Sequence, residues 1–293
     1  MPLSSAIVGA ASKPVATKID SRWTMAYAAA LGDALPCYLD TTREAGVIAH
    51  PMFPVCFEWP LILNMRHEIG NVGLTTEEAL RGVHATHDVV LHRPIRADED
   101  LTSQLTVAGV ERRKPGAFMV ARIDTTDDSG IPVCTTWYGT LYRDVAVEGA
   151  DFPAKIMPLP PPPLIAEGEP LDEAEIDIPA GMAHVYTECA RIFNPIHTDA
   201  AVARAAGLPE IILHGTATLA VAVSRIVEFE STKHPERVAR IAGRFGAMVS
   251  MPSILTVRVI ARDSAPDGTS IFFEALNHQG KLAIRDGVVT FRA

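Results

Sequence analysis

The residues best suited to chemistry lie in one short stretch of the second half of the chain. It reads Phe193-Asn194-Pro195-Ile196-His197, and Leu213-His214-Gly215 follows about sixteen residues later. Asn194-Pro195 is a turn signal, which places His197 just before a helix predicted over 198–206. Because the positive end of a helix disfavours imidazolium, His197 is expected to be neutral and able to accept a proton near pH 7.

Gly215 offers the second chemical group. It opens an apolar helix predicted over 215–229, and the first amides of such a helix lack a helical acceptor. Glycine also lets a ligand approach the backbone closely, and a carbonyl held there would have its developing oxyanion stabilised. Asn194 can orient the ligand or the imidazole through its amide. A base and an oxyanion hole together predict proton transfer next to a carbonyl, although each residue alone is also typical of an ordinary turn or cap.

The composition of the chain excludes several classes of protein. The 293 residues are 48% hydrophobic and 21% charged, which is globular usage, and the net charge of −9 argues against a nucleic-acid binder. No stretch approaches the ~20 apolar residues of a membrane helix, and the N-terminus is not a convincing signal peptide. A cytoplasmic location is therefore expected, with reduced thiols at Cys37, Cys56, Cys134 and Cys189.

No metal or other cofactor is predicted. The cysteines are too far apart for a zinc ribbon. His84, His87 and His92 lie on one strand-like segment, but their spacing is expected to place them on different faces.

A proline-rich stretch, Met157–Leu164, divides the chain near its middle. The predicted domains are 1–156 and 168–293, with a linker at 157–167. In the second half, the two helices precede β-type runs at 238–249, 254–262, 270–277 and 281–291. The first half repeats this order more loosely, with helices over 21–32 and 57–69 and strands over 86–91, 101–112, 118–125 and 133–142. Each half therefore predicts one long helix wrapped by an antiparallel sheet, an α+β fold.

The motif Asn194-Pro195-Ile196-His197 followed by Leu213-His214-Gly215 resembles the signature of the MaoC-like, R-specific (type 2) enoyl-CoA hydratases. Weaker resemblances lie at Leu91–Ile95, Phe245–Val249 and Asn277–Lys281, so the likeness covers roughly residues 15–293. The resemblance implies a double hot-dog fold with its active site in the second half. It also implies an acyl-thioester substrate, carried by CoA or an acyl-carrier protein, with water added to or removed from an enoyl thioester.

The chain departs from this pattern at one position. The family has a catalytic Asp two residues before the Asn, and here Ile192 occupies that position. A nearby carboxylate, at Glu188, Asp199 or Asp33, could take its place, or His197 could act alone on a more activated substrate. Activity on simple enoyl-CoAs is thus in doubt. The first half has His50-Pro51 where its buried helix should begin, and proline offers no amide, so that half is expected to shape the acyl tunnel and do no chemistry.

The prediction is a hydro-lyase with His197, Asn194 and Gly215 as catalytic residues and Ile192, Phe193 and His214 as substrate-binding residues. The alternatives are a single-base lyase, isomerase or thioesterase on the same fold, or a non-catalytic acyl-thioester binding protein. Neither a nucleic acid nor a membrane is expected as a partner, and a homodimer is an option.

Overall fold

The structure is a computed structural model that describes residues 2–69, 73–163, 169–230 and 234–293. The chain packs as two compact units, each built from several stretches. The first unit comprises Met1–Thr17, Phe57–His92 and Asp100–Pro158, and the second comprises Lys18–Cys56, Arg93–Glu99 and Leu159–Ala293. Two stretches of the first half of the sequence thus pack with the second half. The single division predicted at 157–167 remains a prediction, and residues 164–167 of that linker lie outside the described part of the chain.

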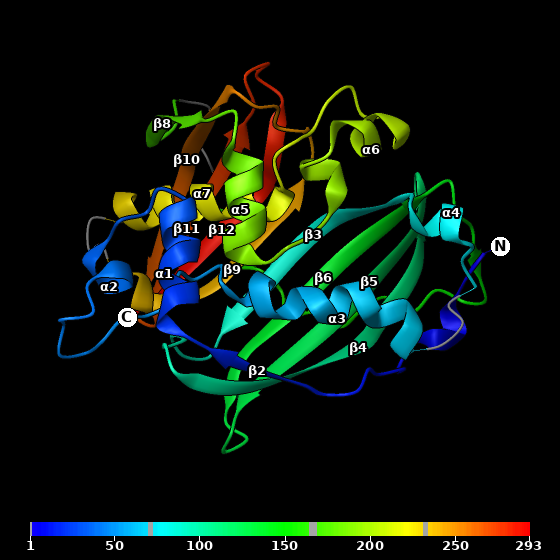
Figure 1. The fold of residues 1–293 in the computed structure, drawn as a ribbon, viewed down its shortest axis with the longest axis horizontal. Coiled ribbons are helices and arrows are strands. Elements are labelled where there is room, and N and C mark those ends of the chain that lie inside the picture. Colours follow the sequence, from blue (N-terminus) through cyan, green and yellow to red (C-terminus); the bar gives the residue numbers. More distant parts are fainter. Residues whose placement is uncertain (1, 70–72, 164–168, 231–233) are drawn as a thin grey trace. The chain divides into compact units, whose positions relative to one another are not determined.

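The first unit is a four-stranded antiparallel sheet with one long helix, α3 (Pro54–Glu68), across its face (Figure 1). The strand order is β4-β5-β6-β3. Leu61 and Met65 of α3 pack with Leu105, Met119 and Ile123 of the sheet in an apolar core. The strands are β3 (Gly82–Leu91), β4 (Glu99–Arg113), β5 (Gly116–Asp127) and β6 (Pro132–Arg143), and the short elements are β1 (Leu3–Ser4), η1 (Ser5–Ile7), α4 (Thr76–Ala79) and β7 (Val147–Glu148).

Helix α3 begins earlier than the sequence predicts. The expected start at Phe57 would have put Pro60 in the first turn, where a proline is tolerated. The helix instead starts at Pro54, whose fixed φ suits a helix start, and Pro60 lies inside the helix. The ring of Pro60 therefore removes one internal hydrogen bond from α3, a cost that burial of Phe57 and Leu61 offsets.

The second unit repeats this plan with five antiparallel strands in the order β9-β12-β11-β10-β8. Helix α7 (Gly215–Phe229) has the predicted bounds, and it packs on β9, β10 and β12. The strands are β8 (Asp172–Ile178), β9 (Val238–Phe245), β10 (Ser253–Ala265), β11 (Gly268–Leu276) and β12 (Leu282–Arg292), and η3 (Pro235–Arg237) precedes β9. Strand β2 (Val15–Ile19) leads from the first unit into the second.

Two short helices of the second unit, α1 (Ser21–Ala30) and α5 (Met182–Ala190), pack against each other. Helix α1 begins at Ser21 as predicted, and Asp20 caps it, because its carboxylate accepts the Trp23 amide at 2.8 Å. Arg191, just after α5, lies over the Trp23 ring at 3.9 Å. The sequence analysis did not predict α5. Along the chain, α2 (Pro36–Leu39) follows α1. The turn η2 (Pro195–His197) and helix α6 (Ala200–Ala205) lie between α5 and α7.

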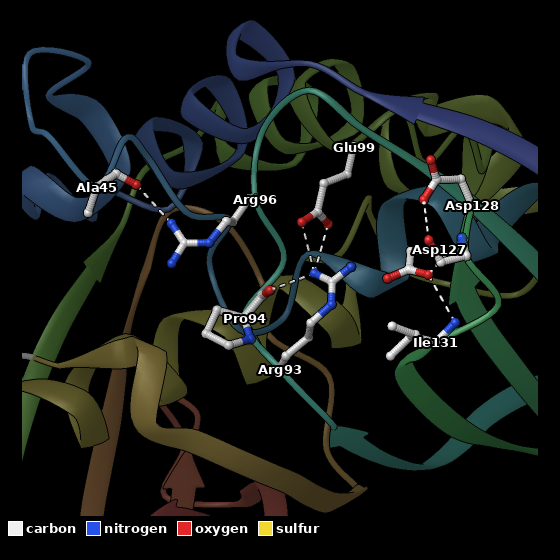
Figure 2. A network of polar contacts seen from close by, with 9 residues as sticks. Ala45, Arg93, Pro94, Arg96, Glu99, Asp127, Asp128 and Ile131 are labelled. Atoms are coloured by element: carbon white, nitrogen blue, oxygen red, sulfur yellow. Dashed lines mark hydrogen bonds and ion pairs between the residues drawn. The ribbon is translucent and has the colours of Figure 1, made fainter.

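The stretch Arg93–Glu99 is tied into the second unit by polar contacts, which Figure 2 shows. Arg93 Nη1 donates to the Pro94 carbonyl at 3.1 Å and to the Glu99 carboxylate at 2.8 Å. Arg96 donates to the Ala45 carbonyl at 2.8 Å. The Ala49 amide donates to the Ile95 carbonyl at 2.8 Å. These bonds hold the segment before His50 in place.

Candidate active site

Two histidine rings form the centre of the candidate site. His197 ends the η2 turn, and His214 directly precedes α7. Their rings stack with centroids 3.7 Å apart and an interplanar angle of 26°. The structure therefore brings together two of the predicted site residues, and Gly215 follows His214 at the start of α7.

The protonation state of His197 follows from its partner. Its Nδ1 lies 2.8 Å from the Ile212 carbonyl oxygen, and a carbonyl only accepts, so Nδ1 carries the proton. In the neutral ring Nε2 then keeps its lone pair and can act as a base. Burial lowers the pKa of His197, and the bond to Ile212 opposes that shift. The imidazole is therefore a neutral base at pH 7.

The physical reason for this neutrality differs from the predicted one. From the sequence, the positive end of the helix over 198–206 is expected to keep His197 neutral. In the structure, α6 is only six residues long, and the Asp199 carboxylate already accepts the first amides of this helix. Burial is the larger cause, since His197 is only 9% exposed.

His214 is more strongly held in the neutral form. Burial, followed by the neighbouring His197, lowers the pKa of His214 to about 2. Its Nε2 lies 3.2 Å from the Thr187 hydroxyl, and the Tyr186 ring packs on it at 5.0 Å. His214 thus presents a rigid, uncharged surface beneath His197 and is not a second base.

The Gly215 amide is one of the first amides of α7, which have no acceptor within the helix. A Cβ placed on Gly215 would meet the Phe245 ring at 3.2 Å. Glycine therefore keeps the start of α7 uncrowded, as an oxyanion donor requires.

The other predicted residues lie around this centre. Ile192 is buried, with 4% exposure, whereas Phe193 is 55% exposed and points its ring to the surface. Asn194 closes the η2 turn with its carbonyl, which accepts the His197 amide at 3.1 Å. The contact between Asn194 and His197 that the structure contains is thus a backbone one.

Several polar residues of the site were missed from the sequence. Tyr186 donates to the Thr216 hydroxyl at 3.1 Å, and its own hydroxyl lies 3.4 Å from that of Tyr27. Tyr27 in turn donates to the Met52 carbonyl at 3.3 Å. Ala183, Tyr186 and Ala190 recur at the three-to-four-residue spacing of a helix face, the signal that could have revealed α5.

Three carboxylates had been considered as replacements for the family Asp. Asp199 caps α6, and Glu188 is exposed on α5. Asp33 is buried, and its carboxylate lies 3.9 Å from His50 Nε2.

The predicted separation of His84, His87 and His92 is wrong for the first two. A bulge in the pairing of β3 with β6 after His84 shifts the register, so the His84 and His87 rings lie 5.4 Å apart. Within the described residues, no group of three His, Cys, Asp or Glu side chains is arranged to hold a metal ion. No helix of that part of the chain is long and apolar enough to span a membrane.

Comparison with solved structures defines the class of fold. A MaoC-like dehydratase from Phytophthora capsici superposes with a TM-score of 0.81 at 20% identity, over 96% of this chain and 95% of that chain. A Mycobacterium tuberculosis protein described as a double hot dog superposes with a TM-score of 0.62 at 14% identity, over 97% and 95% of the two chains. The chain has a double hot-dog fold, as the sequence predicted.

Sequence comparison identifies the family. The MaoC like domain matches residues 165–278, and the FAS1-like, dehydratase domain region matches residues 6–136. A UPF0336 protein of Saccharopolyspora erythraea is 30% identical over 52% of this chain and 99% of that protein. The chain belongs to the MaoC-like dehydratase family.

Two relatives carry enzyme names. Enoyl-CoA hydratase 2 (peroxisomal) of Arabidopsis thaliana is 24% identical over 56% of this chain and 54% of that protein. The 3-hydroxyacyl-thioester dehydratase X of Mycobacterium tuberculosis is 23% identical over 65% of this chain and 64% of that protein. The chain thus spans between half and two thirds of the length of these relatives.

Proposed function

We propose that this chain is a hydro-lyase-type enzyme for acyl thioesters, with His197 as its base and the Gly215 amide as its oxyanion donor. The observation that carries the proposal is the state of His197: a buried, neutral imidazole whose Nδ1–H is fixed on the Ile212 carbonyl, which leaves Nε2 free. The ring that stacks on His197 belongs to His214, which directly precedes Gly215, the first residue of α7. The two relatives with enzyme names act on enoyl or 3-hydroxyacyl thioesters, which supports the same substrate class here.

The proposed reaction begins with proton removal. His197 Nε2 takes a proton from the carbon next to the thioester carbonyl, and the C–H electron pair moves onto the carbonyl oxygen. The Gly215 N–H stabilises the resulting enolate. Loss of a β-hydroxyl as water then needs a proton donor, and the aliphatic side chain of Ile192 cannot supply one. Loss of a general acid–base partner typically costs ~10²–10⁴ in rate.

A second candidate follows from Ile192 itself. Its buried butyl group makes the site apolar where the family has a carboxylate, which disfavours an ordered water. A single-base reaction, such as isomerisation of a more acidic substrate, would need only His197 and Gly215. A thioesterase or a non-catalytic acyl-thioester binding protein are the remaining alternatives on this fold.

Hydration of crotonyl-CoA by the wild type and by Ile192→Asp tests the proposal. We expect slow hydration by the wild type and a gain of ~10-fold or more in the variant, because the carboxylate restores the second group on the water. Ile192→Asn, which matches Asp in size but cannot act as a base, is the control and should show no gain. Fast hydration by the wild type would mean that another carboxylate acts, and Glu188 and Asp199 would be mutated next.

The remaining assignments complete the proposal. Asn194 is the third catalytic residue, Ile192, Phe193 and His214 are the substrate-binding residues, and the first half of the sequence shapes the acyl-binding part. A cytoplasmic location and a homodimer are proposed with it.

A further inference from the structure

The second unit contains a second copy of the turn that carries His197. Asp33-Ala34-Leu35-Pro36-Cys37-Tyr38 aligns without gaps on Ile192-Phe193-Asn194-Pro195-Ile196-His197. Tyr27 precedes Asp33 by the same interval that separates Tyr186 from Ile192. Both copies belong to the second unit.

The backbone bonds of the two copies match one by one. The Asp33 amide donates to the Ala28 carbonyl at 3.0 Å, and the Ile192 amide donates to the Thr187 carbonyl at 3.1 Å. In the next turn, Tyr38 bonds Leu35 at 2.9 Å as His197 bonds Asn194 at 3.1 Å. The residue before each copy, Gly32 or Arg191, has a left-handed φ of 74° or 59°. The two turns therefore share these backbone bonds, although the first forms one turn of α-helix, α2, and the second forms the 3-10 turn η2.

The ring clusters match as well. Tyr38 packs on His50 at 5.5 Å, as His197 packs on His214 at 3.7 Å. Tyr27 contacts His50 at 5.8 Å and 55°, and Tyr186 contacts His214 at 5.0 Å and 53°. The hydroxyls of Tyr27 and Tyr186 meet each other at 3.4 Å, as expected for a pair related by an approximate two-fold axis.

The two copies keep different chemical groups. The first copy retains a carboxylate, Asp33, at the position where the second has Ile192. It has the Tyr38 hydroxyl in place of the His197 imidazole, and Pro51 gives no amide where Gly215 gives one. Each copy therefore holds one base and one hydrogen-bond donor, but at different positions.

The unpaired hydroxyl of Tyr38 indicates a ligand-binding site. Tyr38 has no exposed surface, and its hydroxyl has no hydrogen-bond partner among the described residues. A buried donor left unpaired is unfavourable and calls for an acceptor that the protein does not supply. Burial raises the pKa of Tyr38 well above its usual value, so the group remains a donor.

The carboxylate beside it is held in place by two side chains. The Met52 amide donates to His50 Nδ1 at 3.1 Å, so the neutral ring carries its proton on Nε2 and donates it to Ser224 at 3.1 Å. The Ser224 hydroxyl in turn bonds the Asp33 carboxylate. Burial raises the pKa of Asp33, which strengthens it as a base.

We propose that Asp33 and Tyr38 form a second proton-transfer site, which takes a compound with an acidic C–H next to a carbonyl, such as an acyl thioester. Asp33 removes the proton from the α-carbon, the C–H electron pair forms the enolate, and the Tyr38 O–H holds its oxygen. Return of the proton to the α-carbon exchanges it with solvent, and return to the γ-carbon of an unsaturated chain gives the isomer. A carboxylate base with a tyrosine donor is an established arrangement for this step.

Ser224 and His50 are positioning residues. The site replaces the expectation that the first half does no chemistry.

Deuterium incorporation from D2O into 3-butenoyl-CoA, followed by mass spectrometry, tests this site. The His197→Ala variant is the parent, because it removes the base of the other site. We expect its exchange rate to exceed that of the protein-free reaction and to fall by ~10² or more in Asp33→Asn and in Tyr38→Phe. No exchange by the His197→Ala parent, or unchanged exchange in Asp33→Asn, would overturn the proposal.

Further controls distinguish an effect on folding from an effect on either of the two proposed sites. Tyr38→Phe removes a hydroxyl with no protein partner, so its melting temperature should equal that of the parent. Ser224→Ala should reduce kcat for exchange more than it changes KM and should shift the pH profile, because it frees the Asp33 carboxylate from a hydrogen bond. Crotonyl-CoA hydration by Ile192→Asp depends on His197 and the restored carboxylate and not on Asp33 or Tyr38, so failure of either proposal leaves the other standing.

Discussion

The turn around His197 and the turn around Asp33 keep the same backbone and divide the chemistry between them. One has an imidazole and a glycine amide, and the other has a carboxylate and a tyrosine hydroxyl. The two turns share a left-handed residue before the turn and a proline within it, at Gly32 and Pro36 or Arg191 and Pro195. The comparison shows that this fold constrains the backbone of the site more strongly than it constrains the reacting groups.

The largest effect is expected at His197. His197→Ala should lower kcat for crotonyl-CoA hydration by at least ~10², because it removes the proposed base. His197→Tyr, which copies the residue found in the Asp33 turn, should be equally inactive in this position although it keeps an aromatic ring on His214. Steady-state kinetics of crotonyl-CoA hydration would measure both, because the proposed Asp33 site is expected to act on 3-butenoyl-CoA without His197. Unchanged kcat in either variant would remove His197 from the mechanism.

A second comparison concerns the two central helices. Helix α7 is buried with small and apolar residues, whereas α3 carries a buried carboxyl at Glu58. Glu58 accepts a hydrogen bond from the Thr136 hydroxyl at 2.7 Å, and the Cys134 thiol lies 3.9 Å away. Burial raises the pKa of Glu58 to about 8, so the group is mostly protonated at neutral pH.

Glu58 should therefore make stability depend on pH. Between pH 4.5 and pH 8, folded Glu58 holds a proton that the unfolded chain releases, so the free energy of unfolding falls as pH rises. The slope from this group is about 1.4 kcal/mol per pH unit. Glu58→Gln keeps the acceptor for Thr136 and removes the titration. Denaturant unfolding of both proteins at several pH values should show that, above pH 4.5, the free energy of unfolding of the variant increases relative to that of the wild type. Parallel curves would mean that Glu58 titrates normally.

The smallest effect is expected for the tyrosine pair. Tyr27→Phe and Tyr186→Phe each remove a buried hydroxyl that donates one hydrogen bond and lies 3.4 Å from the other hydroxyl, so each should lower the free energy of unfolding by about 1 kcal/mol. Because the two residues occupy equivalent places, the two losses should be similar. A double-mutant cycle would measure their coupling, and strictly additive losses would argue that the Tyr27–Tyr186 contact contributes nothing.

The sequence predicted best those elements whose pattern is local. Helix α7 has a continuous apolar run between Gly215 and Phe229, and its bounds were predicted without error. The long strands were found through their β-branched and aromatic residues, although the run to Val249 ends at Phe245 because the Gly246 amide turns to bond the Ala283 carbonyl.

The environment of the site could not be predicted in the same way. The stacking of His197 on His214 and the burial that keeps both rings neutral depend on contacts between separate elements. The second copy of the turn was detectable from the common spacing of Tyr27 to Asp33 and Tyr186 to Ile192. It was missed because the first half has no Asn-Pro-x-His and because its next histidine follows after a shorter interval.

The packing of Lys18–Cys56 with the second unit has a consequence for synthesis on the ribosome. This stretch leaves the ribosome about a hundred residues before Leu159, where the largest part of the second unit begins, and only Arg93–Glu99 of its packing partners is made earlier. Helix α1 and the buried rings of Tyr27 and Tyr38 therefore lack most of their packing partners while the first unit is synthesised. Non-local contacts of this kind slow folding and expose apolar surface to aggregation. We therefore expect the nascent chain to depend on chaperones until its last strands, β9 to β12, emerge.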